Sequence, residues 1–180
     1  MSSEDTLVPA HRLWTPEGFR EDEWRHAESA EALEGNGNVI LPLPVFLELD
    51  PALRENAFSR IGVKLAPGEP LDAIVPFLDR LLLVALVFPA YNDGRSYSKA
   101  ELLRSRYGYR GDIRAVGDVL IDQVSHMLRC GFTSLEVTNP VAIARLKAGR
   151  PGGLSLYSQP SAATPGRPSK YAWRRIPVQA

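Results

Sequence analysis

The densest group of side chains that could bind a ligand lies between residues 88 and 132, where Arg, Asp and Gly recur at short intervals. Five residues there carry groups that could surround a small anion: Asp93, Arg95, Tyr97, Arg114 and Asp118. An Arg side chain presents a planar fork of N–H donors, and a helix N-terminus presents unpaired backbone N–H groups. Both suit sulfate, phosphate or carboxylate, so these residues predict an oxyanion site. The simpler alternative is that they are turn residues, helix caps and a local Asp93–Arg95 pair.

Asp118 and Asp122 are four residues apart, which would place two carboxylates on one face of a helix, with Gln123 beside them. Such a pair could serve as acid and base or bind a divalent metal. No third ligand is evident and the three histidines lack a metal-binding spacing, so an N-cap and a surface Asp are favoured and no metal is predicted. Cys130 follows His126 by one helical turn, but its position at a helix C-terminus favours a packing role over that of a nucleophile.

These residues must be positioned by strands and helices that alternate along the chain. Short apolar runs with the length of strands occupy residues 61–67, 81–88, 112–117 and 132–137. Helices are predicted at 98–108, where Ser98 and Glu101 form a capping box, at 118–131 with Asp118 as N-cap, and at 139–149 with Asn139 as N-cap and Pro140 in the first turn. A helix around residues 69–80 is weaker because Pro76 interrupts it.

Alternating strands and helices predict an α/β fold with a parallel sheet. A series of βα units resembling part of a TIM barrel is favoured, and an open doubly wound sheet is the alternative. In both architectures the loops at the carboxyl ends of the strands form the ligand face, so the loops after residues 88 and 117 are expected to be neighbours.

Composition divides the chain into three parts. Residues 1–37 are expected to be an acidic irregular segment, residues 38–149 the α/β domain, and residues 150–180 a basic tail rich in Pro, Gly and Ser that lacks the composition of a folded segment. Residues 1–35 carry nine acids and three bases, whereas the residues after Glu136 carry seven bases and no acid.

Charge and cysteine content exclude several classes. With 21 basic and 21 acidic residues, the chain has no overall attraction for nucleic acid or an anionic membrane. One cysteine allows no internal disulfide or CxxC pair. The N-terminus lacks the apolar core of a signal peptide and the longest apolar run is far shorter than a membrane span, so a cytoplasmic protein without a membrane partner is predicted.

The stretch "DGRSYSKAELLRSRYGYRGDIRAVGDVLIDQ", followed by "RCGF", resembles the bacterial family DUF934 over roughly residues 62–137. The family pattern maps onto the predicted site residues and also onto Arg104, Gly111, Cys130 and Gly131. This chain departs from it at Ser96, where the family usually has Gly, and at His126, where it usually has an apolar or aromatic residue. Members are labelled oxidoreductases involved in sulfite reduction because they are encoded beside enzymes of that pathway, and the family has no established catalytic residue.

The resemblance implies an accessory protein of assimilatory sulfate and sulfite reduction, here with an oxyanion-binding face. One alternative is a noncatalytic adaptor or electron-delivery partner of sulfite reductase or of another sulfur-assimilation protein. Another is an oxidoreductase with an unidentified cofactor, although no flavin, nicotinamide or haem motif is present, and whether the protein is an enzyme stays open. A homodimer formed through an uncovered sheet edge is a further open alternative.

Overall fold

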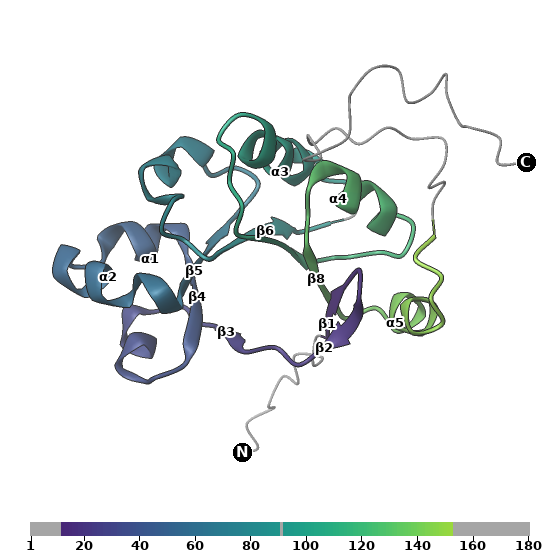
Figure 1. Ribbon diagram of the computed structural model, residues 1–180, viewed down its shortest axis with the longest axis horizontal. Coiled ribbons are helices and arrows are strands. Elements are labelled where there is room, and N and C mark those ends of the chain that lie inside the picture. Colours follow the sequence, from purple (N-terminus) through teal and green to yellow (C-terminus); the bar gives the residue numbers. More distant parts are fainter. Residues whose placement is uncertain (1–11, 91, 153–180) are drawn as a thin grey trace, which may run out of the picture.

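A computed structural model describes residues 12–90 and 92–152, and these residues form a curled sheet with helices on its outer side (Figure 1). The strands of the described residues are β1 (Arg12–Thr15), β2 (Gly18–Arg20), β3 (Trp24–His26), β4 (Asn38–Pro42), β5 (Ile61–Leu65), β6 (Leu83–Phe88), β7 (Asp112–Gly117) and β8 (Ser134–Val137). The helices are α1 (Leu43–Glu48), α2 (Pro51–Ala57), α3 (Arg95–Ser105), α4 (Val124–Cys130) and α5 (Pro140–Lys147), with short 3-10 turns at Ala30–Glu34, Phe58–Arg60, Leu71–Ala73 and Val75–Phe77.

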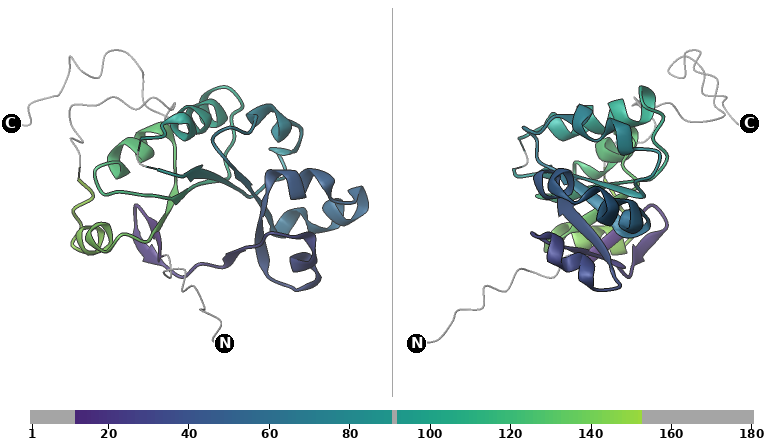
Figure 2. Two further views of the ribbon diagram at one scale, coloured as in Figure 1. Left: turned by 180° about the vertical axis from the view of Figure 1, so that it is seen from behind. Right: turned by 90° about the vertical axis from the view of Figure 1, so that its left-hand side faces the viewer.

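The sheet has the strand order β2-β1-β8-β7-β6-β5-β4-β3. From β3 to β8 all neighbouring strands are parallel, whereas β1 runs antiparallel to both β8 and β2. The two edge strands β2 and β3 are joined by only three residues, 21–23, so the chain itself holds the edges within about 14 Å of each other. The sheet therefore curls almost into a ring, as Figure 1 and the view from behind in Figure 2 show.

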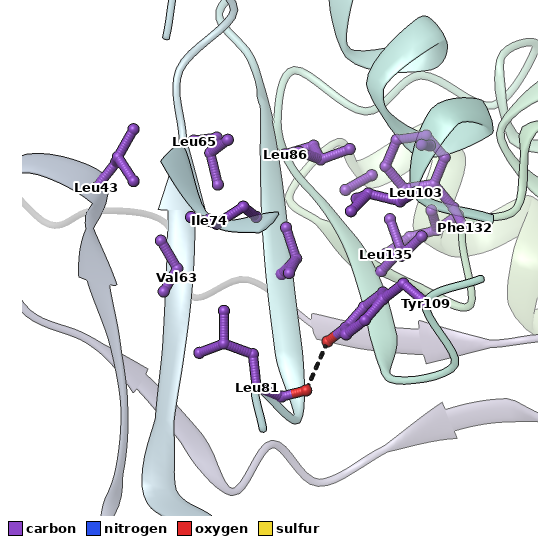
Figure 3. Packing of buried hydrophobic residues seen from close by; sticks show 14 of the residues in the cluster. Leu43, Val63, Leu65, Ile74, Leu81, Leu86, Leu103, Tyr109, Phe132 and Leu135 are labelled. Carbon is purple, nitrogen blue, oxygen red and sulfur yellow. Dashed lines mark hydrogen bonds between the residues drawn. The ribbon is translucent and has the colours of Figure 1, made fainter. Parts of the chain in front are cut away.

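The outer face of the sheet packs against the helices and forms the main hydrophobic core. Side chains such as Leu65, Leu86 and Leu135 alternate with inward-facing residues along their strands, as the two-residue period of a strand requires. Figure 3 shows this core and the buried Tyr109, whose hydroxyl donates a hydrogen bond to the carbonyl of Leu81 over 3.1 Å. The concave inner face carries a second, smaller cluster of Ile40, Leu83, Ala85 and Val116.

Gly62 in β5 leaves space on the concave face for larger side chains from other strands. A Cβ at Gly62 would lie 2.9 Å from a methyl group of Leu83 and 3.2 Å from the Trp24 ring. The missing side chain therefore leaves room above β5 for Trp24, which reaches from β3, and for Leu83 on β6.

The α/β class, the four strands expected after residue 60 and the α5 cap are confirmed. Asn139 accepts hydrogen bonds from Val141 N and Ala142 N, with Pro140 at the first helical position. The interruption at Pro76 is confirmed as well, because two 3-10 turns take the place of a helix there. The β6 run is buried on both faces, as predicted.

Two helix starts were wrongly predicted. Helix α3 begins at Arg95, not near Ser98, because the Asp93 carboxylate accepts the Arg95 backbone N–H and the Ser96 hydroxyl donates to Val87 O. Helix α4 begins at Val124, because residues 118–123 form a non-helical loop that ends in a turn, and Asp118 N donates to Phe88 O over 2.7 Å.

Order also begins earlier than expected. Residues 12–26, predicted to be irregular, form β1, β2 and β3. Their three- and four-residue strands have no apolar run, and their hydrogen-bonding partners β8 and β4 are supplied by later parts of the chain. The tail prediction falls almost entirely on residues 153–180, which lie outside the described residues.

Candidate functional site

The loop after β6 places Asp93 and Arg95 at the start of α3. The Asp93 carboxylate accepts hydrogen bonds from Nε and Nη2 of Arg95 over 3.0 and 2.7 Å. The bond from Arg95 lowers the pKa of Asp93, and the bond to Asp93 raises the pKa of Arg95. The Arg95 side chain is 63% exposed, so its remaining Nη1 edge is accessible to a ligand.

Lys99 joins this loop to the loop after β5. Its Nζ donates to the carbonyls of Ala66 and Glu69 over 2.7 and 2.6 Å. Burial lowers the pKa of Lys99. Gly68 in the same loop lies beside Arg95, because a Cβ added to it would be 3.9 Å from Arg95 Nη1. We call Arg95, Lys99 and the loop 66–69 the cationic corner, which lies at the carboxyl ends of β5 and β6.

Tyr97, the third residue of α3, uses its ring for packing. The ring centroid lies 4.9 Å from that of Phe88 and 4.4 Å from that of His126 on α4. Burial, followed by the nearby Cys130 and Asp122, raises the pKa of Tyr97 to about 12. Its phenol therefore stays protonated at neutral pH.

The other predicted residues occupy two further places. Asp118, Asp122 and Gln123 belong to the turns between β7 and α4, where Gln123 Oε1 accepts the Leu120 N–H over 3.3 Å. The spacing of Asp118 and Asp122 suggested that they share a helix face. They do not, because these turns are not helical. Arg114 points to the concave face, away from the side of the sheet that α3 covers.

The concave face holds a group of polar side chains that sequence reasoning missed apart from Arg114. This concave polar cluster consists of Asp22, His26, Asp112, Arg114, Ser134 and Glu136. Arg114 is only 2% exposed, and its Nη1 donates to both oxygens of Asp22, at 3.0 and 2.9 Å, and to Glu136 Oε1 at 3.3 Å. Asp112 lies on the Nε side of Arg114, bridged by the Ser134 hydroxyl.

His26 completes the cluster from the opposite edge of the sheet. Its Nε2 lies 2.9 Å from both carboxylate oxygens of Glu136, and its side chain is 26% exposed. A carboxylate that orients an imidazole is an arrangement used in general acid–base chemistry. An anion is less suited to this place, because three carboxylates already surround Arg114 within the described residues.

One sequence signal could have indicated part of this cluster. Arg114 and Glu136 are charged residues with apolar neighbours on both sides in the strands "DIRAVG" and "SLEV". A charge between apolar neighbours on a strand marks a face that is either solvated or lined with partners. Nothing in the local sequence could identify Asp22 and His26 as those partners.

Several residues of the recognised motif have structural roles. Arg104 donates to the carbonyls of Tyr109, Gly111 and Gly131 over 2.7 to 2.9 Å. A Cβ at Gly111 would lie 2.2 Å from the Tyr109 hydroxyl, so the loop before β7 requires glycine there. Arg104 and Gly111 therefore shape the loop before β7 and offer little to a ligand.

Cys130 is buried at the end of α4, and its Sγ lies 3.9 and 3.8 Å from the two ring nitrogens of His126. Burial and then Arg129 lower the pKa of His126, which favours the neutral ring. A neutral imidazole and a helix C-terminus both fail to stabilise a thiolate.

Two kinds of feature are absent from residues 12–90 and 92–152. No group of three or more His, Cys, Asp or Glu side chains is arranged there to hold a metal ion. No helix there has the length and apolar character that crossing a bilayer requires.

Comparison with known families matches residues 62–165 to the family described as "Bacterial protein of unknown function (DUF934)". The match covers more than half of the chain and extends into the Pro-rich tail, beyond the expected end near residue 137. It starts after β4, so Asp22 and His26 lie outside it. No curated protein matches the chain.

Proposed function

This chain belongs to the DUF934 family, and we propose that it is a cytoplasmic accessory protein of assimilatory sulfate and sulfite reduction that binds a small oxyanion at the cationic corner. The pathway part of this proposal is supported by the sequence motif and its resemblance. The binding part is supported by one observation in particular, the exposed guanidinium edge of Arg95 at the first residue of an 11-residue helix.

Three features of the cationic corner favour an oxyanion. Asp93 accepts from Nε and Nη2 of Arg95, so Nη1 is the edge that would donate to an anion. The N-terminus of α3 adds a positive dipole end, and Lys99 adds a second cation. The loop 66–69 includes Gly68, which lets backbone come close to a ligand without a side chain in the way.

Local charges limit the expected affinity. The carboxylates of Asp93 and Glu69 both lie close enough to Lys99 to raise its pKa. Their two negative charges largely balance the positive charges of Lys99 and Arg95. Binding must therefore depend on hydrogen-bond geometry, and we expect a dissociation constant of about 1 mM for sulfite or sulfate.

The parallel strands β3 to β8 and their outer helices also lead us to infer an incomplete barrel of the TIM type. In such barrels ligands bind at the carboxyl ends of the strands, which is where the cationic corner lies. The antiparallel β1–β2 hairpin takes the place of further βα units.

The binding part is tested by thermal unfolding of the full chain in sulfite, sulfate and chloride at equal ionic strength. At 100 mM anion, a dissociation constant of about 1 mM corresponds to about 2.7 kcal/mol of stabilisation, or several degrees in the melting temperature. Arg95→Ala should abolish the shift. Arg20→Ala is the matched control, because Arg20 is 58% exposed and also pairs with a nearby carboxylate, Glu17. Equal shifts in chloride would refute the small-anion proposal.

A second candidate function is acid–base chemistry at the concave polar cluster, which the His26–Glu136 contact favours. Growth of a deletion strain on sulfate, sulfite or sulfide distinguishes the two sites. We expect failure on sulfate and sulfite, rescue by sulfide, and complementation by His26→Gln but not by Arg95→Ala. The reverse pattern would assign the function to the concave polar cluster, and normal growth of the deletion strain on every source would refute the pathway.

A further inference from the structure

A groove lies between the segment after β3 and the first two helices, on the side of the molecule where α1 and α2 project (Figure 1). It has a volume of about 340 Å³ and is lined chiefly by Glu28, Val45, Glu48, Leu49, Asp50 and Leu53. We call it the acidic groove. It is separate from the cationic corner and the concave polar cluster, since it shares no residue with either.

The groove combines an apolar floor with an acidic rim. Leu53 is 39% exposed, and Val45 and Leu49 line the groove beside it. The Asp50 carboxylate is fixed at the rim because it caps α2 by accepting from Ala52 N and Leu53 N. Glu28 is 79% exposed even though it pairs with Lys64. A ligand with a bulky apolar side chain and positive charges would match this surface.

The chain itself contains a segment with that chemistry. Residues 165–180, "PGRPSKYAWRRIPVQA", hold four bases and no acid, and Trp173 stands directly before Arg174 and Arg175. Because the chain is neutral overall and residues 153–166 carry no charge, residues 1–152 carry four more acids than bases. The segment and the rest of the chain are therefore electrostatically complementary.

We propose that residues 165–180, which lie outside the described residues, dock in the acidic groove. Trp173 contacts the apolar floor, while Arg174 and Arg175 face Glu28 and Glu48. Aromatic and Arg side chains are the residues that most often anchor an interface. Trp173 lies 21 positions after Gly152, and a chain of that length can span up to about 70 Å. A domain of this size has a radius of gyration of about 15 Å, so the segment can reach the groove of its own chain.

The proposal is tested by photo-cross-linking of the full chain with Trp173→p-benzoylphenylalanine, followed by mass-spectrometric mapping. We expect cross-links to residues 28–30 and 45–53. Glu48→Arg should lower their yield by about tenfold or more, because it places like charges together. Asp79→Arg is the matched control, since it reverses an exposed acid that does not line the groove, and should leave the yield unchanged.

Reversing the charges on both sides of the contact shows whether Glu48→Arg acts through charge or by disturbing the fold. Combining it with Arg174→Glu and Arg175→Glu should restore the cross-links to the groove. Cross-linked monomers and cross-linked dimers both support the proposal when the groove residues are the targets, and gel mobility shows which chain donates the segment. Cross-links that map elsewhere, or a yield that does not respond to Glu48→Arg, would overturn it.

Discussion

Two arginines of the same sequence motif have opposite surroundings, and this difference decides what each can do. Arg95 is 63% exposed and pairs with a carboxylate two residues away. Arg114 is 2% exposed and pairs with Asp22 and Glu136 on other strands and loops. An exposed pair contributes little to stability and can be shared with a ligand, whereas a buried one is committed to the fold.

We therefore predict unequal effects of the same substitution at these two positions. Arg114→Met removes the cation from between buried carboxylates and should lower the free energy of unfolding by about 3–5 kcal/mol. Arg95→Met should change it by less than about 1 kcal/mol. Urea unfolding at neutral pH measures both, and equal losses would show that the concave polar cluster is not a buried ionic network.

The partly buried phenol of Tyr97 predicts a loss of stability in alkali. Its pKa rises from 10.0 to about 12 on folding, so the folded state holds the proton more tightly than the unfolded state. The resulting contribution to the free energy of unfolding is fully present below pH 10 and is lost as the pH rises from 10 toward 12. Tyr97→Phe cannot titrate, so relative to this variant the natural chain should lose about 1 kcal/mol between pH 8 and pH 11, after allowance for partial exposure. Parallel pH profiles for the two proteins would contradict the burial of this phenol.

At the scale of elements, helix ends followed the local sequence only where no strand competed for the first turn. Asn139 caps α5 with its own side chain, as predicted. At α3 the start moved from Ser98 to Arg95, because the Ser96 hydroxyl anchors this turn to Val87 O of β6 over 2.6 Å. A capping box in the sequence is therefore a weaker guide when the preceding loop is short.

Capping predicts a contrast between two helices. Asn139→Ala removes the acceptor for Val141 N and Ala142 N and should cost about 1 kcal/mol. Ser98→Ala should cost only a few tenths of a kcal/mol, because Ser98 is exposed inside α3 and Ala favours the helix. Thermal or urea unfolding of both variants measures this contrast, and a larger loss for Ser98→Ala would restore the sequence-based helix start.

The sequence predicted elements whose signal is local and missed those that depend on distant partners. Strands β5 to β8 are apolar runs, and Asp93 and Arg95 are near neighbours, so both were accessible to pattern reasoning. By contrast, Asp22 lies 92 residues from Arg114, and His26 lies 110 residues from Glu136. Such pairs exist only because the sheet curls until its first and last parts meet, and no periodicity encodes that curl.

For the whole molecule, the polar contacts of Asp22 and His26 decide how firmly the curled sheet is held closed. The edge strands β2 and β3 are not paired with each other, and residues 21–23 bridge them. Asp22 fastens this bridge to Arg114 on β7, while His26 fastens β3 to Glu136 on β8. Access to Arg114, the most buried member of the concave polar cluster, therefore depends on opening this bridge.

Asp22→Asn should loosen the bridge without unfolding the sheet. The amide retains an oxygen that can accept the Trp24 N–H, as Asp22 Oδ1 does over 3.0 Å, but it loses the charge that Arg114 binds. Loss of a charged hydrogen bond should speed hydrogen exchange in β3 by about tenfold, with β6 unchanged because its opening requires global unfolding. Glu23→Ala, an exposed neighbour on the same bridge, should leave both strands unchanged. Faster exchange in β6 as well would mean that the bridge belongs to the same cooperative unit as the core, and the concave face would then have no independent route of opening.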